Sequence, residues 1–211
     1  MDRATVFVDG NNWYHGLKNA GLTGLGWLNY AKVSAKIVGG RDWIGTRYYI
    51  GQVQQKRNMA LYADQRRCMA WLTARDKRIS IHYGRLEERP VVNEFAREVK
   101  RYLGSLTVRI DPAVFKHLIA RAAHHEHTNV MVEKAVDVML AVDLVRMADR
   151  NEYDVAYLLA SEGDYTPAVQ TAMAAGKRVF AAAIEPGAQL AKVVYKYLPL
   201  KREWFADCFG E

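Results

Sequence analysis

The stretch Val155-Ala-Tyr-Leu-Leu-Ala-Ser-Glu-Gly-Asp-Tyr165 joins an apolar run to a polar segment that carries two acids. Its first part, residues 155–160, is short and continuously apolar, which predicts a strand buried on both faces of a sheet. Glu162 and Asp164 follow where that strand should end, with Gly163 between them. Ligands of open α/β sheets bind beyond the carboxyl ends of the strands, so this segment is a candidate for half of a binding site.

Another acid follows the first apolar run of the chain. Residues 5–8 predict a second buried strand, and Asp9-Gly-Asn-Asn12 comes directly after it. Gly10 permits a tight turn, and Asn11 or Asn12 can cap a following helix. If the two strands are neighbours, Asp9 meets the acids of the first segment at one edge of the sheet.

The rest of the chain predicts strands that alternate with helices. Further strands are expected at residues 47–53, 79–83 and 178–183, and helices at 13–19, 30–38, 56–75, 112–123, 132–150, 166–175 and 188–197. This alternation predicts an α/β fold with a mainly parallel sheet covered on both faces. We expect one domain over residues 1–200, with 85–129 as a helical insertion or lid. Residues 201–211, rich in aromatics, form a tail that packs on the domain or on a partner, so a homodimer is an open alternative.

A further acid lies within the expected helix 132–150. At about 100° per residue, Asp137 falls on the apolar face, and Glu133 lies one turn earlier on the same side. A carboxylate in that position is costly unless a metal ion or a partner such as Lys134 compensates its charge. In the alternative interpretation, Asp137 lies near the helix N-terminus and interacts favourably with the helix dipole. Asp143, about 120° away, is expected to form an ion pair or a structural hydrogen bond.

These acids predict a metal site. The helix leads into the strand 155–160, so its N-terminus returns to the edge where Asp9, Glu162 and Asp164 lie, and this brings Asp137 to them. Carboxylates so close repel one another unless cations bind them. Oxygen ligands select hard ions, here Mg²⁺ or Mn²⁺, which can activate water and stabilise the leaving oxygen in phosphodiester hydrolysis. A net charge of +7 is compatible with a polyanionic substrate, although charge alone leaves a merely basic protein equally open.

Three blocks of the sequence resemble one known family. They are Val6-Phe-Val-Asp9-Gly-Asn-Asn12, Glu133-Lys-Ala-Val-Asp137-Val-Met-Leu-Ala-Val-Asp143-Leu, and Ser161-Glu-Gly-Asp164-Tyr-Thr-Pro-Ala-Val169 with Gly176-Lys-Arg-Val179 after it. In order and spacing they resemble the NYN-domain family, a branch of the PIN-like nucleases, over about residues 5–183. The sequence departs from the family pattern where Glu162 replaces the usual aspartate and where Ala160-Ser161 replaces Ser-Gly.

The resemblance implies a PIN-like three-layer α/β/α sandwich and a Mg²⁺- or Mn²⁺-dependent endoribonuclease whose partner is RNA. It implies that Asp9, Asp137, Glu162 and Asp164 are the catalytic and metal-binding acids. Asn12 matches a polar residue that orients substrate or water. The remaining substrate-binding candidates are Asn11, Tyr14 as a stacking group, Lys134 as a phosphate contact, and Ser161.

Two other functions stay open: a non-catalytic RNA-binding or regulatory module of the same fold, and a structure-selective DNA nuclease. The replacement at Glu162 favours the first of these. His124, His125 and His127 lack the spacing of a zinc site and are more typical of an exposed basic patch. The chain has no nucleotide-binding glycine motif and no nucleophile elbow. Two distant cysteines and the lack of a signal peptide or a long apolar run predict a cytoplasmic protein with no membrane segment.

Overall fold

The computed structural model describes residues 1–56, 58–106 and 111–210, without the side chains of residues 88, 90 and 125–131. The chain divides into two compact units. The first comprises Met1–Arg85 and Glu133–Glu211, and the second comprises Leu86–Val132.

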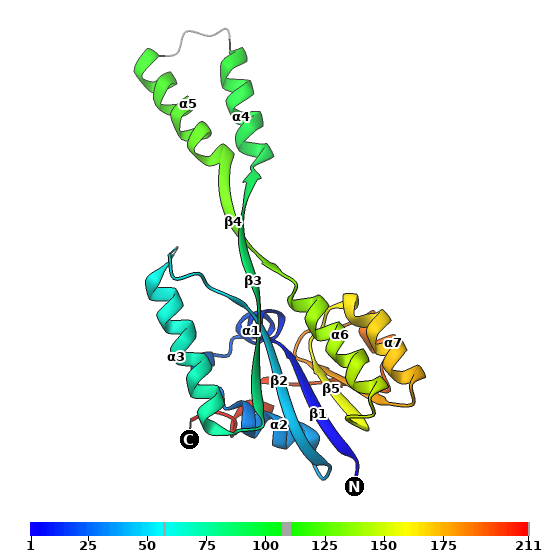
Figure 1. Ribbon diagram of the computed structural model, residues 1–211. Coiled ribbons are helices and arrows are strands. Elements are labelled where there is room, and N and C mark those ends of the chain that lie inside the picture. The colour runs from blue at the N-terminus through cyan, green and yellow to red at the C-terminus, as the bar shows by residue number, and fades with distance from the viewer. Residues whose placement is uncertain (57, 107–110, 211) are drawn as a thin grey trace. The chain divides into compact units, whose positions relative to one another are not determined.

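The strands follow the order β4-β3-β2-β1-β5-β6-β7 in one sheet (Figure 1). Their bounds are β1 Arg3–Asp9, β2 Asp42–Gln52, β3 Ile79–Val92, β4 His127–Lys134, β5 Val155–Leu159, β6 Arg178–Ala183 and β7 Lys196–Pro199. The pairs from β3 across β2, β1, β5 and β6 to β7 are all parallel. The predicted α/β class with a mainly parallel, PIN-like sheet is therefore confirmed.

Strand β1 is the point where the order of the sheet reverses. The chain goes from β1 to β2 and β3 on one side, and later to β5 and β6 on the other. Val8, next to the end of β1, pairs with Leu159 at the end of β5. The carboxyl ends of the two strands thus lie side by side at a topological switch point, which is where ligands bind in open α/β sheets.

Helices cover both faces of the sheet (Figure 1). The bounds in the first unit are α1 Gly10–Asn19, α2 Tyr30–Val38, α3 Met59–Arg75, α6 Val136–Asp149 and α7 Thr166–Ala174, with the 3-10 turns η1 Leu25–Trp27, η2 Gly163–Tyr165, η3 Leu190–Lys192 and η4 Arg202–Phe205. Val6 and Val8 of β1 pack with α1, α2 and α3, whereas Phe7 packs with α6 and α7. Because successive side chains of a strand point to opposite faces, β1 contributes residues to the hydrophobic core on each face of the sheet.

The second unit is built around two helices. They are α4, Glu94–Ser105, and α5, Pro112–Glu126, and they pack against each other. The Asn93 side chain caps α4 by accepting a hydrogen bond from the Ala96 N–H at 3.1 Å. His124 is exposed, and the side chains of His125 and His127 lie outside the described residues.

Strands β2 and β3 extend beyond the expected residues 47–53 and 79–83, and two predicted helices are wrong in their start or type. The helix expected from residue 132 begins at Val136, because Ala135 has a φ of 68° and ends β4 there. The helix expected at residues 188–197 is only the turn η3 followed by β7, since Lys196–Pro199 pairs with β6. Pairing with the sheet overrides the helical preference of that segment.

The C-terminal segment packs on the first unit. Phe205 and Cys208 are fully buried, and the Asn29 N–H donates to the Cys208 carbonyl at 2.8 Å. Among the described residues, no helix is long and apolar enough to cross a membrane.

Candidate metal and catalytic site

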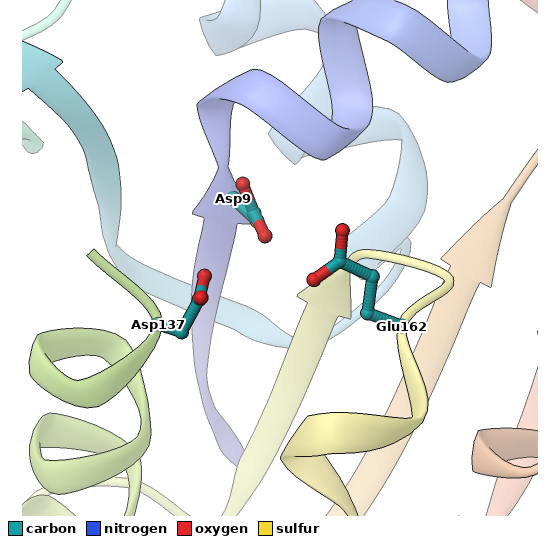
Figure 2. A group of neighbouring side chains, drawn as sticks. All are labelled: Asp9, Asp137 and Glu162. Carbon is teal, nitrogen blue, oxygen red and sulfur yellow. The ribbon is translucent and has the colours of Figure 1, made fainter. Parts of the chain in front are cut away.

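Three carboxylates meet at the switch point. Asp9 ends β1, Asp137 lies in the first turn of α6, and Glu162 follows β5. One oxygen from each lies within 4.8 Å of the others, and the three side chains point toward one another (Figure 2). Segments far apart in the sequence thus converge on a volume that one cation can fill.

Asp9 is held rigidly. It is 2% exposed, and its Oδ1 accepts the Asn12 N–H at 3.1 Å, which makes Asp9 the N-cap of α1. Burial raises the pKa of Asp9, and the charge of Asp137 raises it further, against the lowering effect of its hydrogen bonds. In the absence of a cation, the surroundings of Asp9 therefore disfavour its ionised form.

Tyr165 connects two of the acids. Its hydroxyl lies 2.7 Å from Asp9 Oδ2 and 3.1 Å from Asp137 Oδ1, and the residue is 1% exposed. Burial and both carboxylates raise the pKa of Tyr165 well above its ordinary value, so the hydroxyl remains a donor. Sequence reasoning missed this residue, although it directly follows the second acid of the segment 161–164.

Asn12 positions the third acid. Its Nδ2 donates to Glu162 Oε1 at 2.9 Å, while its Oδ1 accepts the Ser161 N–H at 3.0 Å and the Ser161 hydroxyl at 3.3 Å. One amide side chain on α1 therefore fixes both the loop after β5 and the carboxylate that the loop carries. Burial and the charge of Asp9 raise the pKa of Glu162.

Glu133, which lies on β4 and not in the expected helix, is a fourth acid near the group. Its Oε1 accepts the Gly51 N–H. Burial raises the pKa of Glu133 from 4.5 to about 7, and the charges of Asp9, Asp137 and Glu162 contribute to this shift. Glu133 is thus the member of this edge that most favours the protonated form.

This shift predicts how pH acts on the metal-free protein. Because the pKa of Glu133 is higher in the folded state, the folded protein binds this proton more tightly than the unfolded chain does. The contribution of Glu133 to the free energy of unfolding is therefore fully present below pH 4.5 and is lost as the pH rises through about 7. Glu133→Gln keeps the acceptor for Gly51 and removes the titration. We expect Glu133→Gln in EDTA to unfold roughly 2–4 °C above wild type at pH 8, the shift that about 1 kcal/mol causes, and near wild type at pH 4.5.

The matched control is Glu152→Gln, an exposed acid just before β5, at the end of the sheet away from Glu162. This variant should follow the wild-type melting temperature across the whole pH range. Equal melting curves for Glu133→Gln and wild type at pH 8 would contradict the prediction.

The two acids of α6 differ from each other. Asp137 is exposed, so the expected burial on the core face is wrong, and its place at the helix N-terminus agrees with the alternative interpretation. The ion pair expected for Asp143 is confirmed, since its carboxylate lies 2.6 Å from both Arg47 and Arg146 and accepts from Tyr49 at 2.8 Å. These contacts hold the pKa of Asp143 below its ordinary value despite partial burial.

Asp164 lies outside the group of three carboxylates. It is exposed at the turn η2, beside a surface cavity that it lines with Gln189 and Lys192. The backbone of Gly163, between the two acids, avoids the left-handed region, and a Cβ there would collide with the Gln189 side chain. The lack of room for a side chain therefore explains why residue 163 is a glycine.

The other candidate residues occupy two places. Asn11 and Tyr14 lie on exposed positions of the first turns of α1, and the Asn11 N–H also hydrogen-bonds to Asp9. Lys134 ends β4, next to the turn that leads into α6, and is half-buried. Their contacts with a substrate remain predictions.

Fold and site together define a nuclease-like α/β protein with an acidic cluster that can bind a metal ion. The model of the NYN domain matches residues 3–198, which is nearly the whole chain, and the chain belongs to the NYN family of the PIN-like nuclease superfamily. Proteins of this family are generally nuclease-like and generally use a divalent metal ion.

One solved structure that the fold resembles is VPA0982 from Vibrio parahaemolyticus RIMD 2210633, described as a protein of unknown function. The TM-score is 0.53 at 11% identity, and the match covers 96% of this chain and 94% of the other. At this identity the likeness concerns the fold alone. No curated protein matches the chain.

Proposed function

We propose that the protein is a Mg²⁺- or Mn²⁺-dependent endoribonuclease that hydrolyses phosphodiester bonds of RNA. The observation that carries the proposal is the group Asp9, Asp137 and Glu162, whose oxygens lie within 4.8 Å at the switch point of an NYN domain. A nucleic-acid substrate agrees with the family and with the net charge of +7.

The residues present fit a hard divalent cation. All three donors are carboxylates, which are the ligands that Mg²⁺ and Mn²⁺ prefer. The pKa values of Asp9 and Glu162 are raised partly by neighbouring negative charge, and a cation relieves that repulsion. When bound, the ion supplies a Lewis acid that polarises the phosphate and lowers the pKa of water.

The residues around the acidic group then have different roles. Tyr165 holds Asp9 and Asp137 at a fixed spacing, and Asn12 holds Glu162. We assign Asp164 to the substrate side of the site, as an acid in addition to the group of three carboxylates. In this scheme the substrate contacts come from Asn11, Asn12, Tyr14, Lys134 and Ser161.

The decisive experiment is a cleavage assay on single-stranded RNA, single-stranded DNA and flapped DNA duplexes, each with Mg²⁺, Mn²⁺ or EDTA. Internal cuts in RNA that require metal would support the proposal. Cleavage of flapped DNA alone would assign the protein to the structure-selective DNA nucleases. Undiminished cleavage in EDTA would contradict the role of the acidic group.

Asp164→Asn gives a graded prediction in the same assay. We expect the variant to cut RNA more slowly than wild type but faster than Asp9→Asn, because Asp164 lies outside the group of three carboxylates. The exposed position makes an unchanged melting temperature the expected result. A loss as complete as that of Asp9→Asn would show that Asp164 joins the ion during turnover.

One observation favours a second function, a non-catalytic RNA-binding module. Glu162 stands where the NYN pattern has aspartate, and its side chain reaches one methylene further. Tight RNA binding without metal-dependent cleavage, in wild type and in Glu162→Asp, would support this alternative. Faster cleavage by Glu162→Asp than by wild type would instead place the protein among the active nucleases.

A further inference from the structure

A cavity of about 370 Å³ lies within the first unit, on the side of the sheet that α1, α2 and α3 cover. Residues of α1, η1, α2, β2 and α3 line it. Its volume falls in the range of small-molecule sites, which are commonly mostly apolar with a few polar groups. Two of the proposed substrate contacts, Asn11 and Tyr14, are among the residues that line it, but the three carboxylates of the acidic group are not.

The cavity and the acidic group meet where β1 passes into α1. Gly10 and Asn11, which line it, directly follow Asp9 in the chain. Tyr48, another lining residue, pairs with Val8 in the sheet, and the charges of Asp9 and Glu133 contribute to raising its pKa. A group seated in the cavity therefore contacts the residues that directly follow Asp9 in the chain.

Close packing at Gly10 fixes this junction. A Cβ there would lie 2.6 Å from the Tyr48 ring and 2.7 Å from the Tyr49 carbonyl oxygen, so only glycine lets α1 begin at this distance from β2. The Tyr48 ring also meets the Tyr30 ring edge to face, with centroids 4.9 Å apart. This wall of the cavity is therefore rigid and aromatic.

The lining offers flat apolar surface and few free polar groups. Tyr14 at the rim is 43% exposed, and Leu61 opposite on α3 is 51% exposed. The amide of Gln65 is already used, since its Nε2 donates to the Gly51 carbonyl at 2.8 Å and its Oε1 accepts the Val53 N–H at 3.0 Å. A planar heterocycle suits such a lining, because base stacking on aromatic groups needs no specific hydrogen bonds.

We infer that this cavity is a nucleobase-binding subsite, which takes the base of a nucleotide next to the phosphate held at the acidic group. The inference rests on the proposed function, because the proposed function assigns a phosphodiester to the acidic group, and Asp9 of that group directly precedes the cavity residues Gly10 and Asn11. The base stacks on Tyr14 and fills the apolar interior. Asn11 and Asp64 are the exposed polar side chains of the lining, so discrimination between bases is weak.

Cys68 provides a direct reporter. It is half-buried on the cavity wall, whereas Cys208, the other cysteine of the chain, is fully buried under the C-terminal segment. Alkylation by iodoacetamide at alkaline pH, where the raised pKa of the Cys68 thiol is overcome, should label Cys68 and spare Cys208. A base in the cavity should slow the labelling several-fold.

The experiment is carried out on the full chain in EDTA, so that no substrate is cut. The probes are a short single-stranded RNA, the same sugar-phosphate chain without bases, and the free mononucleotides. We expect the RNA to protect Cys68 and the abasic chain to leave it reactive. Binding of the RNA without protection of Cys68, or protection by mononucleotides but not by RNA, would overturn the inference.

A cavity-filling variant gives a second measurement. Cys68→Phe places a ring in the cavity, and Ala74→Phe adds a ring at an exposed position of the same helix. We expect Cys68→Phe to bind RNA about 10-fold more weakly, the loss of roughly one stacked base, with Ala74→Phe near wild type. Equal RNA binding by both variants, with unchanged melting curves, would contradict the subsite.

The two proposals fail separately. Protection of Cys68 by RNA together with no metal-dependent cleavage would overturn the nuclease and leave the base subsite standing. Cleavage of RNA without protection of Cys68 would keep the nuclease and overturn the subsite.

Discussion

Asp9→Asn is expected to abolish metal-dependent cleavage while leaving the protein folded. Asparagine caps a helix as well as aspartate, so the hydrogen bond to the Asn12 N–H survives. The change removes a buried negative charge from the three that lie within 4.8 Å. A loss on the order of 10³-fold in rate, about 4 kcal/mol of barrier, is the expected effect of removing this ligand. Because repulsion falls, the metal-free variant should melt at or above the wild-type temperature.

The control for Asp9→Asn is Asp149→Asn, which makes the same chemical change at an exposed acid at the far end of α6. Rates should be measured at saturating RNA over a range of Mn²⁺ concentrations. If excess Mn²⁺ restored the variant fully, Asp9 would only tune affinity. If Asp9→Asn cut RNA at the wild-type rate, the acidic group would have no part in the reaction.

Tyr165→Phe is expected to give the second largest effect. The variant should bind the metal ion more weakly, with no direct effect on the contacts to the substrate. The change removes the hydroxyl that donates to Asp9 at 2.7 Å and to Asp137 at 3.1 Å. Loss of a group that orients metal ligands typically weakens metal binding by about 10- to 100-fold. The buried carboxylate of Asp9, left without one of its donors, should lower stability by about 1–3 kcal/mol. Titration with Mn²⁺ followed by calorimetry measures the first effect, and denaturant unfolding in EDTA the second.

Tyr153→Phe is a matched control for this experiment. Tyr153 is fully buried, and its hydroxyl donates to the Leu144 carbonyl at 2.8 Å. It should lose stability as Tyr165→Phe does and keep wild-type affinity for Mn²⁺. The same affinity in Tyr165→Phe and wild type would contradict the positioning role of Tyr165.

The sequence was informative about the sheet because its central strands are buried on both faces. The apolar runs of β1 and β5 could be recognised from composition alone, and acids at their ends predicted the edge where a site would form. Asp137 was harder to place. Periodicity treated residues 132–134 as the first helical turn, whereas Ala135 adopts a positive φ and turns β4 into α6.

The contacts of Tyr165 could not be predicted, because they depend on tertiary geometry. The 3-10 turn η2 directs its hydroxyl inward between β1 and α6, while Asp164 one residue earlier stays exposed. The pattern of residue types along the chain does not determine which side chains meet in the folded protein. The hydrogen bond between Asn12 and Glu162 could not be predicted for the same reason.

The unequal anchoring of the carboxylates bears on which ions the protein accepts. Asp9 is locked at the end of a central strand, but Glu162 is exposed on a loop and is held through one amide. A coordination shell with one fixed oxygen and one on a longer, adjustable arm can follow changes in ionic radius. Magnesium requires nearly ideal octahedral geometry, whereas larger ions tolerate irregular shells. We therefore expect the longer side chain of Glu162 to make the proposed site tolerant of ions of different radius.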